Sequence, residues 1–269
     1  MKTYAIGDVH GRADLLEALL SFIDRENQSA PDDYRIVFLG DIIDRGPDSK
    51  RAMDLVVVEL RRRPASRLIL GNHEEFLLLF LDLPAKRNLV FDHWMSNGGL
   101  ASASSYGLDV SRSYATIAAA HKNLLDLLLR HPNHIAAMRN AASYVVSGDH
   151  VLVHAGLRPG IMLKDQTTKD LRTIRGDFLE SDYDFPLRVV HGHTETRSGR
   201  AEIYNNRIAI DTGAHATGAL SALVIENNQP PRFLTTIQSR SSIAVQTAKP
   251  EIFVTLEHVQ AKVARRLTV

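Results

Sequence analysis

Six residues of types that bind divalent metal ions lie beside glycines or at the ends of short apolar runs. They are Asp8, His10, Asp41, Asn72, His154 and His193. A carboxylate can bridge two cations, whereas an imidazole or an amide oxygen serves one. Six ligands with one bridging carboxylate suit two divalent ions about 3.5–4 Å apart. Because every donor atom is oxygen or nitrogen, the set favours Mn²⁺, Fe or Zn²⁺ over Cu(I).

Each cluster has a simpler explanation when it is taken alone. Asp8 and His10 near a glycine turn are, by themselves, more typical of turn chemistry or of a surface pair than of a metal site. Asn72 with Glu74 is typical of a helix cap. The His-Gly-His sequence at 191–193 indicates little by itself. Five such clusters in order, each after a predicted strand, together predict a metal site.

Short apolar runs precede the clusters, and these runs must position them. Runs at 4–6, 36–39 and 68–70 each lead into a glycine and a polar group, and residues 13–27 have helical apolar spacing. In repeated strand–loop–helix units, functional groups gather beyond the carboxyl ends of the strands. The sequence therefore predicts an α/β fold with the polar clusters along one edge of its sheets.

The remainder of the chain divides into a helical part, further strands and a weakly patterned end. We expect helices at 76–83 and 124–130 within a helical insertion at about 75–140. Further strands are predicted at 143–147, 151–154, 187–190, 201–204, 207–211, 221–225 and 232–237. Residues 240–269 are predicted to be a C-terminal tail, with a short helix within 253–263.

Composition excludes several classes of protein. The 269 residues are 44% hydrophobic and 23% charged, which excludes collagen-like, low-complexity and disordered chains. A net charge of +1 gives no reason to expect nucleic-acid binding. The chain has no cysteine, so disulfides, cysteine-ligated zinc, iron–sulfur clusters and thiol nucleophiles are excluded.

No targeting or membrane segment is apparent. The N-terminus reaches Gly7-Asp8 before an apolar signal region could form, and the longest apolar run, 76–81, is far shorter than the about 18 residues of a membrane span. We therefore expect a cytoplasmic protein without a membrane partner, and the sequence leaves the oligomeric state open.

Five motifs together resemble the phosphoprotein phosphatase (PPP) family of calcineurin-like metallophosphoesterases, in particular its bacterial and phage-type serine/threonine phosphatase branch. They are Gly-Asp-Val-His-Gly at 7–11, Gly-Asp-Ile-Ile-Asp-Arg-Gly at 40–46, Gly-Asn-His-Glu at 71–74, His-Ala-Gly at 154–156 and His-Gly-His-Thr at 191–194. The resemblance spans about residues 3–225. It implies a four-layer α/β/β/α sandwich over 1–239, with a dinuclear metal centre between the sheets.

The resemblance also assigns the predicted ligands to two metals, most simply Mn²⁺, with Fe or Zn²⁺ as alternatives. Asp8 and His10 would hold the first metal, and Asp41 would bridge. The second metal would be held by Asn72, His154 and His193. His193 is preferred to His191 because the family ligand directly precedes the Thr of Gly-His-Thr.

Three further residues would act on the substrate, according to the same resemblance. His73 would face the substrate and protonate the leaving oxygen, and Asp44 would orient its ring. Arg45 would clamp the phosphate, since a guanidinium binds two phosphate oxygens in a fork. Arg175 is a second candidate clamp, with Arg172 as its competitor.

Other residues of the matching segments are expected to be structural. Trp94 is predicted to lie in the core rather than to form a substrate platform, although Trp94 or Tyr106 could stack on a base. Asp211 is expected to support the site by hydrogen bonds without binding metal.

The activity implied is phosphoester hydrolysis by a metal-bridging hydroxide, with His73 as general acid. Asp44 and Glu74 favour a protein phosphatase acting on phosphoserine or phosphothreonine, and also on phosphotyrosine. The alternative is a symmetrical diadenosine tetraphosphate hydrolase, so the partner is a phosphorylated protein or a nucleoside polyphosphate. A non-catalytic, metal-bound regulatory protein is a third hypothesis, against which the intact Asp44, His73 and Arg45 argue.

Overall fold

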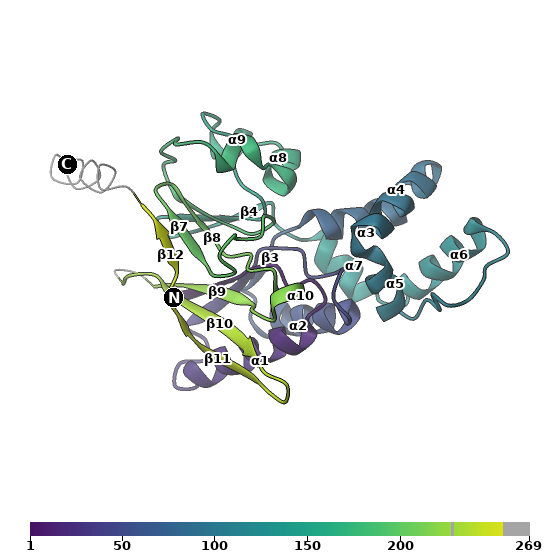
Figure 1. Cartoon of the computed structure of the whole chain (residues 1–269), viewed down its shortest axis with the longest axis horizontal. Helices are drawn as coiled ribbons and strands as arrows, with labels where there is room; N and C mark the ends of the chain where they lie inside the picture. The colour runs from purple at the N-terminus through teal and green to yellow at the C-terminus, as the bar shows by residue number, and fades with distance from the viewer. Residues whose placement is uncertain (227–228, 255–269) are drawn as a thin grey trace.

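The strands form two six-stranded sheets in the computed structural model, which describes residues 1–226 and 229–254 (Figure 1). The first sheet has the order β11-β10-β9-β1-β2-β3 and the second β12-β7-β8-β6-β5-β4. The strands of the first sheet are β1 (Lys2–Ile6), β2 (Tyr34–Phe38), β3 (Arg67–Leu68), β9 (Ser221–Ile225), β10 (Arg232–Gln238) and β11 (Ile243–Ala248). Those of the second are β4 (Tyr144–Ser147), β5 (His150–Val153), β6 (Arg188–His191), β7 (Glu202–Tyr204), β8 (Arg207–Ala209) and β12 (Glu251–Phe253).

Strand direction determines where the functional loops meet. In the first sheet β1, β2 and β3 are parallel, with Tyr4 paired to Ile36. In the second sheet β5, β6 and β8 are parallel, with Leu152 paired to Val190. The carboxyl ends of parallel strands lie at one edge of a sheet, so the loops that follow these strands can share one site.

Alternating side chains build a core on each side of the sheets. Val37 and Leu39 of the first sheet pack with Leu152 and Val190 of the second in an apolar layer between the sheets. The intervening Phe38 faces the opposite way, into the core beneath the helices. This alternation is what a strand buried on both faces requires.

Helices cover the outer faces of both sheets. The first sheet carries α1 (Ala13–Glu26) and α2 (Ser49–Arg62), and the second carries α8 (Thr168–Thr173) and α9 (Gly176–Leu179) (Figure 1). A short helix, α10 (Ala214–Thr217), follows β8. The predicted α/β/β/α sandwich is therefore confirmed.

The helical segment after β3 projects beside the sandwich as an arm (Figure 1). It contains α3 (Asn72–Asp82), α4 (Arg87–Trp94), α5 (Leu100–Ser105), α6 (Ile117–Leu128) and α7 (Pro132–Arg139). Pro132 opens α7, a position where its fixed φ and missing N–H suit a helix start. Trp94, Leu124 and Ile135 connect the arm to the core that lies under α1 and α2.

Residues after 240 form strands where the sequence analysis expected a tail. β11 pairs with β10 in the first sheet, and β12 pairs with β7 in the second, so this segment extends both sheets. β11 is half-buried or exposed along its length, which explains why its apolar pattern is weak. Most of the predicted helix at 253–263 lies outside the described residues. No described helix has the length and apolar character needed to cross a membrane.

Candidate metal centre

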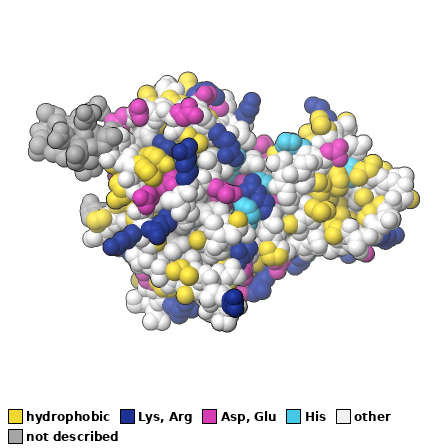
Figure 2. Space-filling model, viewed as in Figure 1, with side chains coloured by type: hydrophobic (Ala, Val, Ile, Leu, Met, Phe, Trp, Pro, Cys, Tyr) yellow, Lys and Arg dark blue, Asp and Glu magenta, His cyan; other side chains and the backbone are white. Residues whose placement is uncertain are grey.

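The six predicted ligands come together at the carboxyl ends of strands from both sheets. Asp8 and His10 follow β1, Asp41 follows β2, Asn72 begins α3 after β3, and His154 and His193 follow β5 and β6. Figure 2 shows histidine, arginine and acidic side chains gathered in the middle of this face, where the arm joins the sandwich.

Asp41 lies at the centre of the cluster. Its Oδ1 is 3.4 Å from His154 Nε2, and its Oδ2 is 3.7 Å from His10 Nε2. Two groups of three residues have ligand atoms within 4.8 Å of one another, and Asp41 belongs to both. The groups are His10, Asp41 and His73, and Asp41, His154 and His193. His73 thus stands in the first group, where the sequence analysis expected Asp8.

Two histidines are oriented by backbone carbonyls. His10 Nδ1 is 2.9 Å from the carbonyl oxygen of Ile43, and His154 Nδ1 is 2.9 Å from that of Leu39. Burial lowers the pKa of both imidazoles, which favours the neutral form. A neutral imidazole that donates from Nδ1 leaves the lone pair of Nε2 facing Asp41, as a metal ligand requires.

Asp8 and His193 carry the unpaired buried atoms of the cluster. Asp8 Oδ2 accepts a 3.0 Å hydrogen bond from the His193 backbone N–H. Among the described residues, Asp8 Oδ1 and His193 Nε2 have no hydrogen-bond partner. Burial raises the pKa of Asp8, as do the nearby charges of Asp211 and Asp41. Unpaired buried groups are costly, and a carboxylate oxygen and an imidazole nitrogen fit a divalent cation.

Asn72 completes the group around His154. Its Oδ1 is 3.1 Å from His154 Nε2, so the amide oxygen and the imidazole nitrogen converge on the same point. Two nearby glycines leave room for the carboxylates of Asp41 and Asp8. A Cβ on Gly71 would lie 2.2 Å from Asp41 Oδ1, and one on Gly192 would lie 2.0 Å from Asp8 Oδ1.

Glu74 shapes the loop that carries Asp41. Its carboxylate is fully buried and accepts hydrogen bonds from the backbone N–H groups of Asp41 (2.8 Å), Ile42 (2.8 Å) and Gly71 (3.1 Å). Glu74 therefore holds the ligand loop and does not face a substrate. Its presence gives no direct indication of which phosphoester is bound, contrary to the use made of it in the sequence analysis.

Backbone strain is concentrated in the same loops. Within residues 1–226 and 229–254, five residues other than glycine have a left-handed φ, namely His10, Asp41, Asp44, Arg45 and His193. All five are predicted site residues, and such conformations cluster at functional sites where surrounding contacts impose them. Here the His10 backbone N–H donates to the Asp41 carbonyl at 2.8 Å, and its carbonyl accepts from Gly46 at 3.0 Å.

His73 and Asp44 form a buried pair beside the cluster. His73 Nδ1 is 2.7 Å from Asp44 Oδ2, and its Nε2 is 3.9 Å from Asp41 Oδ2. Burial alone lowers the pKa of His73, but the Asp41 charge and the Asp44 hydrogen bond raise it above the ordinary value. This arrangement favours an imidazolium with Nε2–H directed toward the cluster.

Two residues of the arm support Asp44. Trp94 Nε1 donates to Asp44 Oδ2 at 2.8 Å, and Ser102 Oγ donates to Asp44 Oδ1 at 2.5 Å. Trp94 is fully buried, as expected of a core residue, but it also contributes to the site. Tyr106 is buried as well and hydrogen-bonds His134 at 2.8 Å. Neither ring is available to stack on a base.

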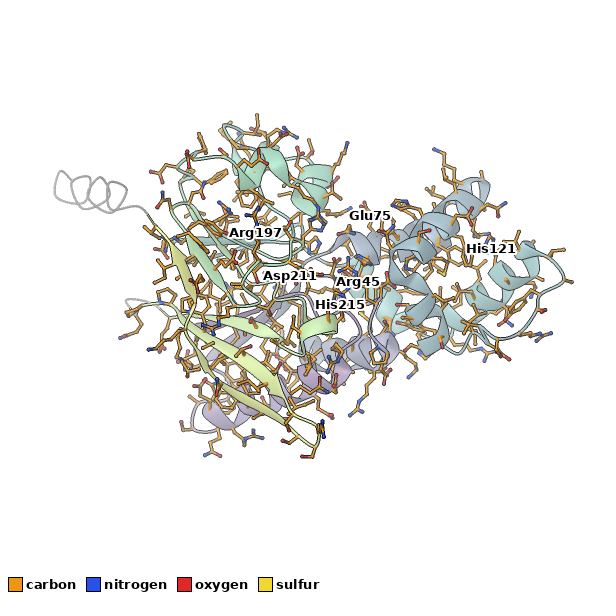
Figure 3. All side chains as sticks on the ribbon, viewed as in Figure 1. Arg45, Glu75, His121, Arg197, Asp211 and His215 are labelled. Atoms are coloured by element: carbon orange, nitrogen blue, oxygen red, sulfur yellow. The ribbon has the colours of Figure 1, made fainter. Side chains whose placement is uncertain are left out.

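Arg45 lies at the rim of the cluster. Its Nη1 is 3.3 Å from Glu195 Oε1, and its Nη2 is 3.4 Å from His73 Nε2. Figure 3 shows Arg45 close to Asp211 and His215, between the sandwich and the arm. Glu195 is a rim residue that the sequence analysis missed, because no local pattern singles it out.

The two competing arginines of α8 and its flank differ in their contacts. Arg175 Nη1 is 3.3 Å from Thr194 Oγ1, and its Nη2 is 3.3 Å from the carbonyl oxygen of His193. Arg172 instead pairs with Glu75 of α3 at 2.5 Å. Arg175 therefore lies at the candidate metal centre, whereas Arg172 forms an ion pair with Glu75.

His191 and Asp211, which are expected not to bind metal, lie next to the cluster, and among the described residues His191 Nε2 and Asp211 Oδ2 have no hydrogen-bond partner. His191 lies on the outer face of β6, with its ring 5.1 Å from that of Phe178. Asp211 Oδ1 accepts a 3.0 Å hydrogen bond from Gly213 N–H, and burial raises the pKa of this carboxyl to about 7, with the Glu195 charge adding to the rise.

Comparisons with known proteins agree with this geometry. Residues 1–211 match the family of calcineurin-like phosphoesterases. The asymmetrical bis(5'-nucleosyl)-tetraphosphatase PrpE of Geobacillus sp. strain WCH70 is 27% identical over 241 residues, covering 82% of this chain and 89% of that protein. A symmetrical bis(5'-nucleosyl)-tetraphosphatase of Yersinia enterocolitica is 41% identical over 78 residues, or 29% of this chain and 24% of that protein.

Solved structures share the fold at lower identity. A candidate diadenosine tetraphosphatase has a TM-score of 0.53 and 21% identity, covering 92% of this chain and 94% of that one. A cold-active protein tyrosine phosphatase has a TM-score of 0.52 and 18% identity, covering 93% and 79% respectively. The match of fold and family confirms the resemblance at the level of calcineurin-like metallophosphoesterases.

Proposed function

The chain belongs to the calcineurin-like phosphoesterase family, which makes it a phosphoric ester hydrolase, and we propose that it cleaves phosphomonoesters on protein side chains with two divalent metal ions and His73 as general acid. The observation that carries this proposal is the 2.7 Å contact between His73 Nδ1 and Asp44 Oδ2, beside the Asp41 carboxylate.

The donor set supports a two-metal site, and we propose Mn²⁺ as the ion. Asp8 and His10 would hold one ion, and Asp41 would serve both. Asn72, His154 and His193 would hold the other. The unpaired Asp8 Oδ1 and His193 Nε2 are the atoms that such ions would satisfy. When bound, two divalent ions lower the pKa of a coordinated water and neutralise phosphoryl oxygens.

The protein residues account for binding and proton transfer. Arg45 and Arg175 approach the cluster from two sides and present guanidinium donors to the equatorial phosphoryl oxygens. Asp44 accepts from His73 Nδ1 and keeps the proton on Nε2, from which it passes to the departing oxygen. The chain has no cysteine, so no thiol nucleophile takes part.

The His73–Asp44 pair favours an ester with a strongly basic leaving group. The alkoxide that leaves phosphoserine needs a proton, whereas a nucleotide that leaves as a phosphate anion needs it far less. The hydrogen bonds from Trp94 and Ser102 hold Asp44 in place for this role. We therefore propose phosphoserine and phosphothreonine proteins as substrates, with phosphotyrosine as a further one.

Dinucleoside polyphosphates are the second candidate substrate class. Its support is the name of the Geobacillus relative, a bis(5'-nucleosyl)-tetraphosphatase that aligns with 82% of this chain. The rings of Trp94 and Tyr106 give no support to a base-stacking site because both are buried.

A side-by-side assay separates the two classes. We would compare kcat/KM for a phosphoserine peptide and for diadenosine tetraphosphate at one Mn²⁺ concentration, with Asp41→Asn protein as the blank. The proposal predicts the higher value for the peptide. A value at least about tenfold higher for the dinucleotide, which corresponds to about 1.4 kcal/mol, would reassign the protein to the second class.

A further inference from the structure

We propose that Glu195 competes with the substrate phosphate for Arg45: it pairs with the guanidinium in the free enzyme and opposes the binding of phosphate there. This inference rests on the proposed role of Arg45 as a phosphate clamp. It adds a residue that sets the affinity of the same site.

The geometry of Arg45 shows the competition. Its Nη1 is 3.3 Å from Glu195 Oε1, while its Nη2 is 3.4 Å from His73 Nε2. The guanidinium therefore spans the rim between a carboxylate and the proposed acid. Fork binding of phosphate needs two parallel N–H donors. While Nη1 pairs with Glu195, the Nη1–Nη2 edge of Arg45 is shared with that carboxylate, so Glu195 and phosphate compete for it.

The loop that carries Glu195 places it at the rim of the candidate metal centre. Glu195 directly follows Thr194, which contacts Arg175, and it lies in the loop that carries His193. Its side chain is 47% exposed, so the carboxylate remains hydrated and can swing away from Arg45.

Glu195 itself places a negative charge where phosphate would arrive. Its Oε1 is also 3.9 Å from His215 Nδ1, and its charge contributes to the raised pKa of Asp211. Figure 3 shows Arg45, His215 and Asp211 converging on this rim. A phosphate dianion at Arg45 would be repelled by Glu195, so the carboxylate opposes binding both by holding the guanidinium and by its own charge.

Removing the charge of Glu195 should therefore strengthen phosphate binding. Exposed ion pairs have modest strength, so Glu195→Gln should lower the dissociation constant for inorganic phosphate by about two- to fivefold. If Glu195 instead served only to position Arg45, the same change would weaken binding. The direction of the effect distinguishes the two roles.

Glu75→Gln provides a matched control. Glu75 is a partly exposed carboxylate near the same face, and it pairs with Arg172 at 2.5 Å, as Glu195 pairs with Arg45. The substitution removes the same charge from an arginine pair that does not reach the candidate ligands. Phosphate affinity should stay within the error of the wild-type value.

The experiment is calorimetric titration of inorganic phosphate into the full chain loaded with Mn²⁺, at low ionic strength, for wild type, Glu195→Gln, Glu195→Ala, Glu75→Gln and Arg45→Ala. We expect tighter binding in both Glu195 variants, weaker binding in Arg45→Ala and no change in Glu75→Gln. With a phosphomonoester substrate, the Glu195 variants should also show a lower KM.

The same titrations distinguish a failure of the Glu195 proposal from a failure of the Arg45 clamp. If Arg45→Ala weakens phosphate binding but both Glu195 variants bind phosphate as wild type does or more weakly, Glu195 is not a competitor, and the proposed clamp stands. If Arg45→Ala leaves phosphate binding unchanged, the clamp itself is wrong. In an Arg45→Ala background the gain from Glu195→Gln should shrink, because the two residues are coupled.

Discussion

The indole Nε1 of Trp94 donates a 2.8 Å hydrogen bond to Asp44 Oδ2, the carboxylate oxygen that is also 2.7 Å from His73 Nδ1. A residue of the helical arm thus reaches, through one carboxylate, the imidazole proposed as general acid. In the proposed mechanism the arm therefore supports catalysis as well as lying beside the sandwich.

Trp94→Phe should reduce turnover of esters with poor leaving groups. The variant keeps an aromatic ring but removes a hydrogen bond to a charged acceptor, so His73 would be held less firmly. We expect kcat for a phosphoserine peptide to fall by about threefold to tenfold, with little change for p-nitrophenyl phosphate. Phe80→Leu, in the same buried cluster, is the control for packing alone and should affect both substrates equally.

Asp44→Asn should shift the pH–rate profile in a defined direction. Asp41 and Asp44 raise the pKa of His73, so the acid form persists to higher pH than in an ordinary histidine. Removing the Asp44 charge lowers that pKa, and the alkaline limb of kcat for a phosphoserine peptide should move to lower pH. An alkaline limb that stays in place or moves upward would argue against the pair.

Asp41→Asn tests the shared carboxylate. If Asp41 serves two ions, its substitution should reduce the metal content of Mn²⁺-saturated protein below two ions per chain and nearly abolish turnover. Asp211→Asn is the control, because Asp211 turns one oxygen toward Gly213 N–H and is expected to leave the metal content unchanged. Elemental analysis of both variants decides between the roles, and two retained ions in Asp41→Asn would refute the bridge.

Arg175→Ala and Arg172→Ala form a matched pair. Arg175 contacts Thr194 and the His193 carbonyl, whereas Arg172 is bound to Glu75. Inhibition by inorganic phosphate should weaken in Arg175→Ala and stay unchanged in Arg172→Ala. The reverse result would exchange the two assignments.

Local sequence pattern was sufficient for the buried strands that precede the site and for the residues that follow them. The runs before Asp8, Asp41 and His154 are buried on both faces, so they read as continuous apolar strands with polar residues at their ends. The parallel order of the strands then brings those ends together. This is why the six predicted ligands could be expected to lie near one another, whereas the choice of His193 over His191 came from the family resemblance.

The supporting contacts could not be predicted in this way. Trp94 and Ser102 are 50 and 58 positions from Asp44, and Glu195 is 150 positions from Arg45. Their partners are set by tertiary packing, and neither a serine in a small-residue helix nor a single exposed glutamate carries a local pattern. The edge strand β11 was missed for a related reason, since its residues are half-buried or exposed and give only a weak apolar pattern.

The most direct test of the account is the leaving-group dependence of His73→Asn. His73 Nδ1 is 2.7 Å from Asp44 Oδ2, but His73 also belongs to a group of potential metal ligands with His10 and Asp41. A loss of activity could therefore come from a lost ion, so metal content must be measured on the same samples. We predict unchanged metal content, a loss of about 10²–10⁴-fold in kcat for a phosphoserine peptide and a much smaller loss for p-nitrophenyl phosphate. Equal losses on the two substrates, or loss of a bound ion, would contradict the assignment of His73 as the general acid.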